Sequence, residues 1–183
     1  MKARSSGIAA GIWGFAEATV FFIVPDVLLS WIALKDPAKA YRACLWATAG
    51  ALVGGAITWY VGSVNPEPAR SLFAWIPAIS DAMIADVRSQ LDERGLVALF
   101  IGPLIGTPYK IYALEAAGAG FGIWGFLLIS IPARLLRFVL VTSVVALVSK
   151  GLKRFVQVRR LQLILVVAWI SFYTFYFYVM SQT

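Results

Sequence analysis

The stretch Leu96-Val-Ala-Leu-Phe-Ile-Gly-Pro-Leu-Ile-Gly-Thr-Pro-Tyr-Lys-Ile-Tyr-Ala-Leu-Glu-Ala-Ala-Gly118 decides the fold class of this protein. It is strongly apolar, yet Gly102, Pro103, Gly106 and Pro108 interrupt it within seven residues. Proline lacks a backbone donor and disfavours a continuous helix. We therefore expect residues 96–118 to enter a membrane as one helix, to turn at these breaks and to leave on the same face. The alternative is a single kinked helix, because tilted spanning helices tolerate proline.

The N-terminal stretch Gly7–Leu34 has the same character. It is apolar except for Glu17 and Asp26, and Pro25 stands beside Asp26. As one straight helix it would be about 42 Å long, whereas the hydrocarbon core of a bilayer is about 30 Å thick. We expect a second re-entrant hairpin, broken at Pro25 and entering from the opposite face. Such irregular backbone is stable at membrane depth only where protein or a wet cavity covers it.

The composition supports a membrane protein. Of the 183 residues, 61% are hydrophobic and 14% are charged, against roughly 45–50% and 25% in soluble domains. A soluble enzyme, a disordered chain and a nucleic-acid-binding domain are all poor fits. Three further stretches, residues 43–64, 121–148 and 161–180, are long and apolar enough to span a bilayer. The prediction is an all-α integral membrane protein with one membrane domain over residues 1–183, two opposed hairpins and about three transmembrane helices.

Residues 65–95 are expected to form an outer loop that contains an amphipathic helix. Ser80 is a suitable N-cap and Gly95 a suitable terminator. Between them, Met83, Ile84, Val87 and Leu91 fall on one helical face. We expect this helix to lie in the membrane interface, where it could also cover the second hairpin; the alternative is an ordinary packed surface helix.

Charge placement predicts the orientation. If residues 7–34 enter and leave on the inner face, ten basic residues and one acid, Asp36, lie inside. Three basic and five acidic residues then lie outside, as the positive-inside rule requires. The N-terminus is therefore expected in the cytoplasm. The inner basic residues are Lys2, Arg4, Lys35, Lys39, Arg42, Lys150, Lys153, Arg154, Arg159 and Arg160.

Six charges remain inside the membrane: the acids Glu17, Asp26 and Glu115, and the bases Lys110, Arg134 and Arg137. Each costs at least roughly 2.5–3.5 kcal/mol at bilayer depth, so each requires a partner or a function. One interpretation is mutual neutralisation, including a pair between Arg134 and Glu115. The other is a polar cavity where the hairpin tips meet.

In the second interpretation, the guanidinium forks of Arg134 and Arg137 hold a phosphate, and Lys110 adds a point charge. The carboxylates of Glu17, Asp26 and Glu115 would take up protons or balance the cations.

Other features exclude or predict partners. The absence of histidine and the single cysteine, Cys44, argue against a metal site, and no cofactor is expected. No hydrolase, zinc-protease or phosphate-loop motif occurs, so we do not expect an enzyme. Gly50 and Gly54 form a close-packing pattern, either within the chain or between two copies. The aromatic run between Phe172 and Tyr178 is interpreted as an interfacial belt.

The order of these features resembles the DedA family of bacterial membrane proteins, also called the VTT or SNARE-associated domain, and within it the small YqaA-like branch. The resemblance covers most of residues 10–148. Its matching pieces are Glu17-Ala-Thr-Val-Phe-Phe-Ile-Val-Pro25-Asp26, Gly50-Ala-Leu-Val-Gly54-Gly55, Gly102-Pro103-Leu-Ile-Gly106-Thr-Pro108, Ala117-Gly118 and Ala133-Arg134-Leu-Leu-Arg137-Phe138.

The chain also departs from the family pattern. The family commonly carries an arginine on each side of the hairpin proline, whereas Lys110 is the only nearby cation here. Pro25-Asp26 stands where Pro-Gly-Glu is usual.

The resemblance implies a multi-pass protein of the bacterial inner membrane that moves a phosphate-bearing lipid, a polyprenyl phosphate or a phospholipid, between leaflets. Membrane lipids would be its partners, and a second copy could dock through Gly50 and Gly54. Two alternatives stay open: a proton-coupled small-ion transporter that uses the same carboxylates, and a scaffold or assembly subunit without transport.

Overall fold

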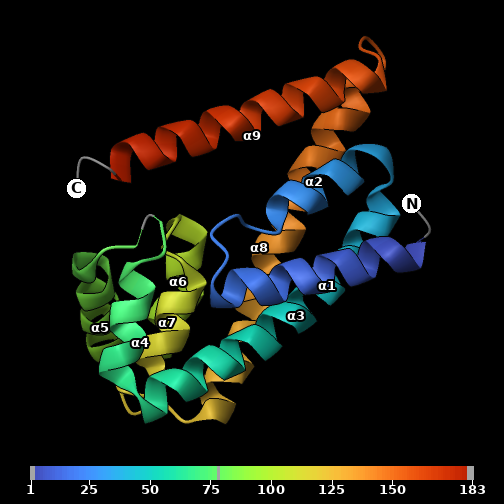
Figure 1. Ribbon diagram of the computed structural model, residues 1–183. Coiled ribbons are helices and arrows are strands. Elements are labelled where there is room, and N and C mark those ends of the chain that lie inside the picture. The colour runs from blue at the N-terminus through green and yellow to red at the C-terminus, as the bar shows by residue number, and fades with distance from the viewer. Residues whose placement is uncertain (1–2, 78, 181–183) are drawn as a thin grey trace.

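Helices make up all the regular structure in residues 3–77 and 79–180, which are the residues that the computed structural model describes. Lys2, counted above among the inner cations, lies outside them. Figure 1 shows the arrangement. The helices are α1 (Ala3–Thr19), α2 (Asp26–Lys35), α3 (Pro37–Val64), α4 (Pro66–Ala74), α5 (Asp81–Arg94), α6 (Leu96–Ile105), α7 (Tyr109–Ala116), α8 (Ile123–Leu152) and α9 (Val158–Met180).

Three of these helices, α3, α8 and α9, are long and apolar enough to cross a membrane. They correspond to the three predicted spans, although α8 begins at Ile123, two residues after the predicted start. The all-helical class and three helices able to cross a membrane are therefore confirmed. The helix α3 begins at Pro37, ahead of the predicted start at residue 43, because Asp36 caps it. The Asp36 carboxylate accepts a hydrogen bond from Lys39 N at 3.1 Å and pairs with Lys39 Nζ at 2.7 Å. These contacts lower the pKa of Asp36 below its usual range.

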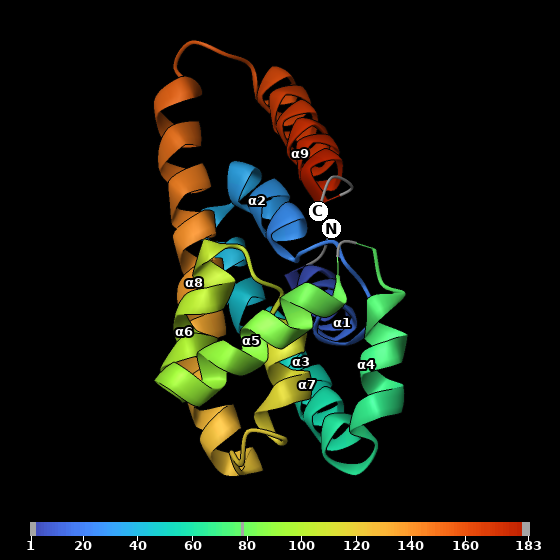
Figure 2. The same cartoon turned by 90° about the vertical axis from the view of Figure 1, so that its left-hand side faces the viewer.

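Both proline-containing stretches are broken, as the sequence predicts. In the first, α1 ends at Thr19 and α2 begins at Asp26, directly after Pro25. In the second, Gly106 adopts a left-handed φ of 111° and Pro108 precedes α7. The chain turns back at each break, as Figure 2 shows for α6 and α7. The prediction of a break at Pro103 is wrong. Pro103 lies inside α6, which continues to Ile105 and ends at Gly106, because a single missing hydrogen bond near a helix end need not interrupt the helix.

The helices on either side of each break, α1 with α2 and α6 with α7, pack against the long helices α3 and α8. The helices α1 and α7 lie against α3, whereas α2 and α6 lie against α8. The upper half of Figure 2 holds α2 and α9, and the lower half holds α4 to α7. This arrangement brings the two breaks to the same region, beside α8 and α9. The depth of either break in a membrane stays a prediction.

The glycine pattern of α3 serves packing within the chain. A Cβ atom at Gly50 would collide with the backbone oxygen of Gly11 in α1, and one at Gly54 would come within 2.6 Å of the Phe15 oxygen. The face that carries Gly50 and Gly54 is therefore covered by α1. A second copy could reach these glycines only if α1 moved away, so oligomerisation through them stays untested and requires that rearrangement.

Replacing Gly50 by Ala should destabilise the protein by about 1–3 kcal/mol, the usual cost of overpacking. The added methyl meets backbone, which cannot rotate away. Gly151→Ala is the matched control, because nothing lies within 4 Å of a Cβ there and alanine is the better helix former. Thermal unfolding in detergent measures both variants. Equal melting temperatures for Gly50→Ala and the parent would contradict the close approach of α1 and α3.

The predicted amphipathic helix is present as α5, with the predicted ends. The Ser80 hydroxyl accepts a hydrogen bond from Met83 N at 3.3 Å, and Gly95, with a φ of 60°, ends the helix. Its apolar residues Ile84, Val87 and Leu91 are buried, and the helix packs on α6 and α7. The predicted packing on the segment 96–118 is therefore confirmed, whereas a position in the membrane interface stays a prediction. The preceding helix α4 was not predicted, although Pro66 at its first turn is a typical start signal.

Two of the segments predicted to be cytoplasmic meet at one end of the bundle. Pro37 and Tyr41 line a small groove together with Lys150 and Lys153. The predicted orientation places both of these basic segments on the same side of the membrane, and their contact agrees with that grouping. The side of the membrane on which this end lies stays a prediction.

Candidate functional site

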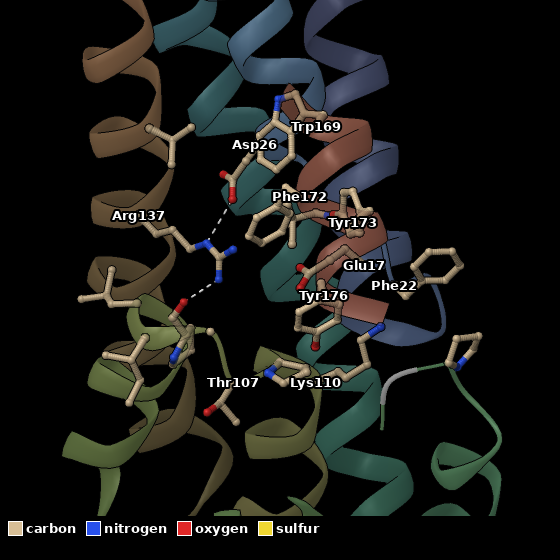
Figure 3. Close-up of a pocket in the computed structure, with 18 of the residues that line it drawn as sticks. Glu17, Phe22, Asp26, Thr107, Lys110, Arg137, Trp169, Phe172, Tyr173 and Tyr176 are labelled. Atoms are coloured by element: carbon tan, nitrogen blue, oxygen red, sulfur yellow. Dashed lines mark hydrogen bonds and ion pairs between the residues drawn. The ribbon is translucent and has the colours of Figure 1, made fainter. Parts of the chain in front are cut away.

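A cavity of about 900 Å³ lies where the two breaks meet. Its walls come from the first break and the start of α2, the second break and α7, the loop before α5, and the facing sides of α8 and α9. Most of the lining side chains are apolar. Figure 3 shows the exceptions, in which Arg137, Asp26, Glu17 and Lys110 surround the open space. A space with this lining suits a molecule that has both an apolar part and a charged part.

Two cations on the cavity wall connect the hairpin tips. Arg137, on α8, donates through Nε to Asp26 Oδ2 at 3.1 Å and through Nη1 to the carbonyl oxygen of Pro103 (Figure 3). Lys110, on α7, donates through Nζ to the carbonyl oxygen of Phe21 in the first break. Lys110 therefore joins α7 directly to the first break. Arg137 reaches from α8 to both hairpins, since it binds Asp26 at the start of α2 and Pro103 in α6. These contacts hold the irregular backbone of both tips together.

Arg134 lies behind the wall and does not line the cavity. Its Nη2 pairs with Glu17 Oε2, and its guanidinium carbon lies 4.8 Å from the ring centroid of Tyr109 and 4.7 Å from that of Phe138. This side chain is fully buried. The two arginines therefore do not form the predicted phosphate clamp on the cavity wall. Arg137 borders the cavity, whereas Arg134 neutralises Glu17.

Glu115 points away from the cavity. Its carboxylate accepts hydrogen bonds from Arg70 Nε at 2.7 Å and Arg70 Nη2 at 2.8 Å, and from Arg88 Nη1 at 3.4 Å. The alternative pairing with Arg134 is wrong. Glu115 is five residues after Lys110, about 140° around the helix, so the two side chains of α7 face different neighbours. The pairing also raises the pKa of Arg70.

Replacing Glu115 by Gln should loosen α4 and α5, which carry Arg70 and Arg88. The expected loss is about 1–3 kcal/mol, the range for a charged hydrogen bond, since both arginines can turn to solvent. Faster proteolysis between α4 and α5 measures the effect. Glu67→Gln is the matched control, because Glu67 pairs with the same Arg70 but its side chain is 80% exposed, where ion pairs contribute little. Equal proteolysis of the two variants would contradict the assigned role.

The charges around the cavity do not balance. Of the six charges that the sequence placed at membrane depth, Glu115 pairs with Arg70 and Arg88, which leaves the carboxylates of Glu17 and Asp26 and three cations. Arg134 and Arg137 neutralise the two carboxylates. In the part of the chain that the structure describes, no carboxylate forms an ion pair with Lys110, whose residue is 2% exposed. A buried ammonium without a counter-charge is costly, so the cavity favours an anion.

Four aromatic residues of α9 complete the wall: Trp169, Phe172, Tyr173 and Tyr176. Two of them hold α9 to the first hairpin, because the Tyr173 hydroxyl accepts from Val24 N at 2.9 Å and Trp169 Nε1 donates to Ser30 Oγ at 3.0 Å. The aromatic run from Phe172 to Tyr178 was predicted to be an interfacial belt, and its place in the cavity wall was not predicted. The sequence does contain a signal for this wall: the other three residues follow Trp169 by three, four and seven positions, which puts all four on one helical face.

Comparisons with known proteins give one relative of modest similarity. An uncharacterized protein of Haemophilus influenzae (strain ATCC 51907 / DSM 11121 / KW20 / Rd) is 26% identical over 133 residues, which is 72% of this chain and 68% of the relative. No family model matches the chain. No solved structure matches it. Membership in the DedA family therefore stays a prediction from the motifs.

Proposed function

We propose that this chain is a DedA-like transporter of the bacterial inner membrane that carries a phosphate-bearing lipid between leaflets. A polyprenyl phosphate or an anionic phospholipid has the required chemistry. The observation that carries the proposal is the ammonium of Lys110, which borders a largely apolar cavity with no carboxylate partner among the described residues. A phosphate would supply the missing negative charge, and the rest of the lipid would occupy apolar surroundings.

Arg137 is the second residue proposed to contact the phosphate. Its Nε and Nη1 already bind Asp26 and the Pro103 carbonyl, which leaves Nη2 as a further donor. Its side chain is 20% exposed, whereas that of Arg134 is fully buried. We therefore assign Lys110 and Arg137 to head-group binding, and Arg134 to holding Glu17 in place.

The broken hairpins would provide the path. In the proposed orientation, with the N-terminus in the cytoplasm, α1 and α2 reach the cavity from the inner face and α6 and α7 from the outer face. A head group crossing the bilayer would then move past the two tips and stay near charged and polar groups. Its hydrocarbon part would remain in lipid, which avoids the large cost of placing a bare charge in hydrocarbon.

The proposal includes proton coupling through Glu17 and Asp26. Asp26 Oδ1 is buried and has no hydrogen-bond partner among the described atoms. Protonation of that oxygen would weaken the hold of Asp26 on Arg137 and so change the cavity. A pH gradient that accelerates lipid transfer would support coupling, and transfer without dependence on the gradient would indicate passive exchange.

The proposal is tested with purified protein in vesicles of neutral phosphatidylcholine. A fluorescent phosphatidic acid placed in one leaflet should reach the other leaflet much faster with protein than without it, whereas fluorescent phosphatidylcholine should gain less. Ion flux without lipid transfer would favour the small-ion transporter. The absence of both activities would favour the scaffold and contradict the proposal.

A further inference from the structure

A second, almost wholly apolar groove runs along the other side of α9. Its volume is about 600 Å³, and α1, the first break, α2 and α9 form its walls. The indole rings of Trp13, Trp31 and Trp169 and the side chains of Val27 and Leu28 lie on these walls. In contrast to the cavity, no charged side chain lines this groove among the described residues.

The groove and the cavity are neighbouring spaces that share one wall at α9. Phe22, Leu165, Trp169 and Tyr173 line both spaces. In Figure 3, Phe22, Trp169 and Tyr173 lie on the α9 side of the cavity, across from Arg137. The hydrogen bonds from Val24 N to the Tyr173 hydroxyl and from Trp169 Nε1 to Ser30 Oγ close this wall. A molecule that occupies both spaces would separate these contacts and would extend from the cationic groups to a purely hydrocarbon-like surface.

We propose that this groove binds one hydrocarbon chain of the same lipid whose phosphate lies at Lys110 and Arg137, an inference that rests on the proposed function. The volume fits a long chain: at about 30 Å³ for a group of the size of water, it holds on the order of 20 methylene groups. The apolar lining matches hydrocarbon, and the cationic cavity beside it matches the anionic end. The groove thereby gives the site a preference for long-chain lipid phosphates over small phosphates.

The contacts of α9 explain how a chain would enter. The helix packs mainly on α2, and in Figures 1 and 2 it lies apart from the lower helices. Ile170 and Thr174, which face the groove, belong to a helix whose other apolar residues are largely exposed. The groove is therefore accessible from the surrounding lipid along the length of α9.

Photolabelling tests this assignment. The probe is phosphatidic acid with a diazirine at the distal end of one acyl chain, in nanodiscs of phosphatidylcholine that contain the full-length protein. The expected result is label on groove residues of α2 and α9, with a clear excess over Leu163 and Val167, which line neither space. The same diazirine on phosphatidylcholine should not show this excess.

Variants give the matched control. Val27→Trp combined with Val166→Trp fills the groove and should abolish the labelling, because both residues line it. Val167→Trp makes the same exchange at the neighbouring position, which lines neither space, and should leave the labelling intact. Thermal unfolding in detergent checks that each variant folds. If the filled variant is labelled like the parent, the groove assignment is overturned.

Lys110→Gln separates the two proposals. If the phosphatidic acid probe labels residues of the cavity instead of the groove, and Lys110→Gln abolishes that labelling, the head-group site is supported and the groove assignment fails. If both probes label the groove equally and Lys110→Gln has no effect, the groove holds bulk lipid, and both proposals fail. Labelling of the groove that is lost in Lys110→Gln supports both.

Discussion

Lys110→Gln is expected to reduce binding of a lipid phosphate about tenfold or more and to slow its leaflet exchange accordingly. A hydrogen bond to a charged group contributes about 1.5–3 kcal/mol, and about 1.4 kcal/mol corresponds to a factor of ten. Lys110 is the cation of the cavity that no described carboxylate neutralises. Glutamine removes the charge but keeps an N–H donor near the Phe21 carbonyl. The exchange assay in vesicles measures the effect directly.

Two further variants make this result interpretable. Lys110→Arg keeps the positive charge and should retain a substantial part of the exchange. Lys39→Gln also removes one lysine charge, but Lys39 pairs with Asp36 at the start of α3 and lines neither the cavity nor the groove, so exchange should stay at the parent rate. Parent-like exchange by Lys110→Gln, with all variants equally folded, would remove Lys110 from the site.

The second large effect concerns stability. Arg134→Met should destabilise the protein by about 3–5 kcal/mol, the usual cost of breaking a buried ion pair by removing one partner. Glu17 is 3% exposed and Arg134 is fully buried, so neither charge can turn to solvent. Loss of the guanidinium also removes the stacking on Tyr109 and Phe138. Denaturant unfolding in bicelles gives the free energy of unfolding.

The matched variant is Glu17→Met together with Arg134→Met. Replacing a buried pair by apolar residues of similar volume is often close to neutral, so the double variant should be more stable than Arg134→Met alone. The coupling energy from the full cycle then measures the pair. Additive losses would show that Glu17 and Arg134 do not act as partners.

The sequence predicted the architecture where backbone chemistry decides it. Pro25 and Pro108 directly precede α2 and α7, where a missing backbone donor costs little, and Gly106 ends α6 with a left-handed φ. The cap at Ser80 and the termination at Gly95 are likewise local. Pro103 shows the limit of this reasoning, since its place relative to the helix end determined whether it broke the helix.

Charge pairing could not be predicted, because partners come from different elements. Arg134 and Arg137 share a helical face, but their positions differ by about 4.5 Å along the axis, and so one meets Glu17 and the other Asp26. Glu115 takes its partners from the loop that the sequence assigned to the outside. The aromatic residues of α9 fit an interfacial belt and a cavity wall equally well as a pattern, and only the path of α9 distinguishes them.

The proposed transport path requires that each of the two broken segments enters and leaves the membrane on one face. Single cysteines in a Cys44→Ala background test this directly with a membrane-impermeant maleimide applied from each side. Cysteines at Ser5 and Lys39 flank the first hairpin, and cysteines at Glu93 and Gly122 flank the second. We expect Ser5→Cys and Lys39→Cys to react from the cytoplasmic side, and Glu93→Cys and Gly122→Cys from the opposite side. Labelling of either pair from two different sides would mean that the segment crosses the membrane and would contradict the account.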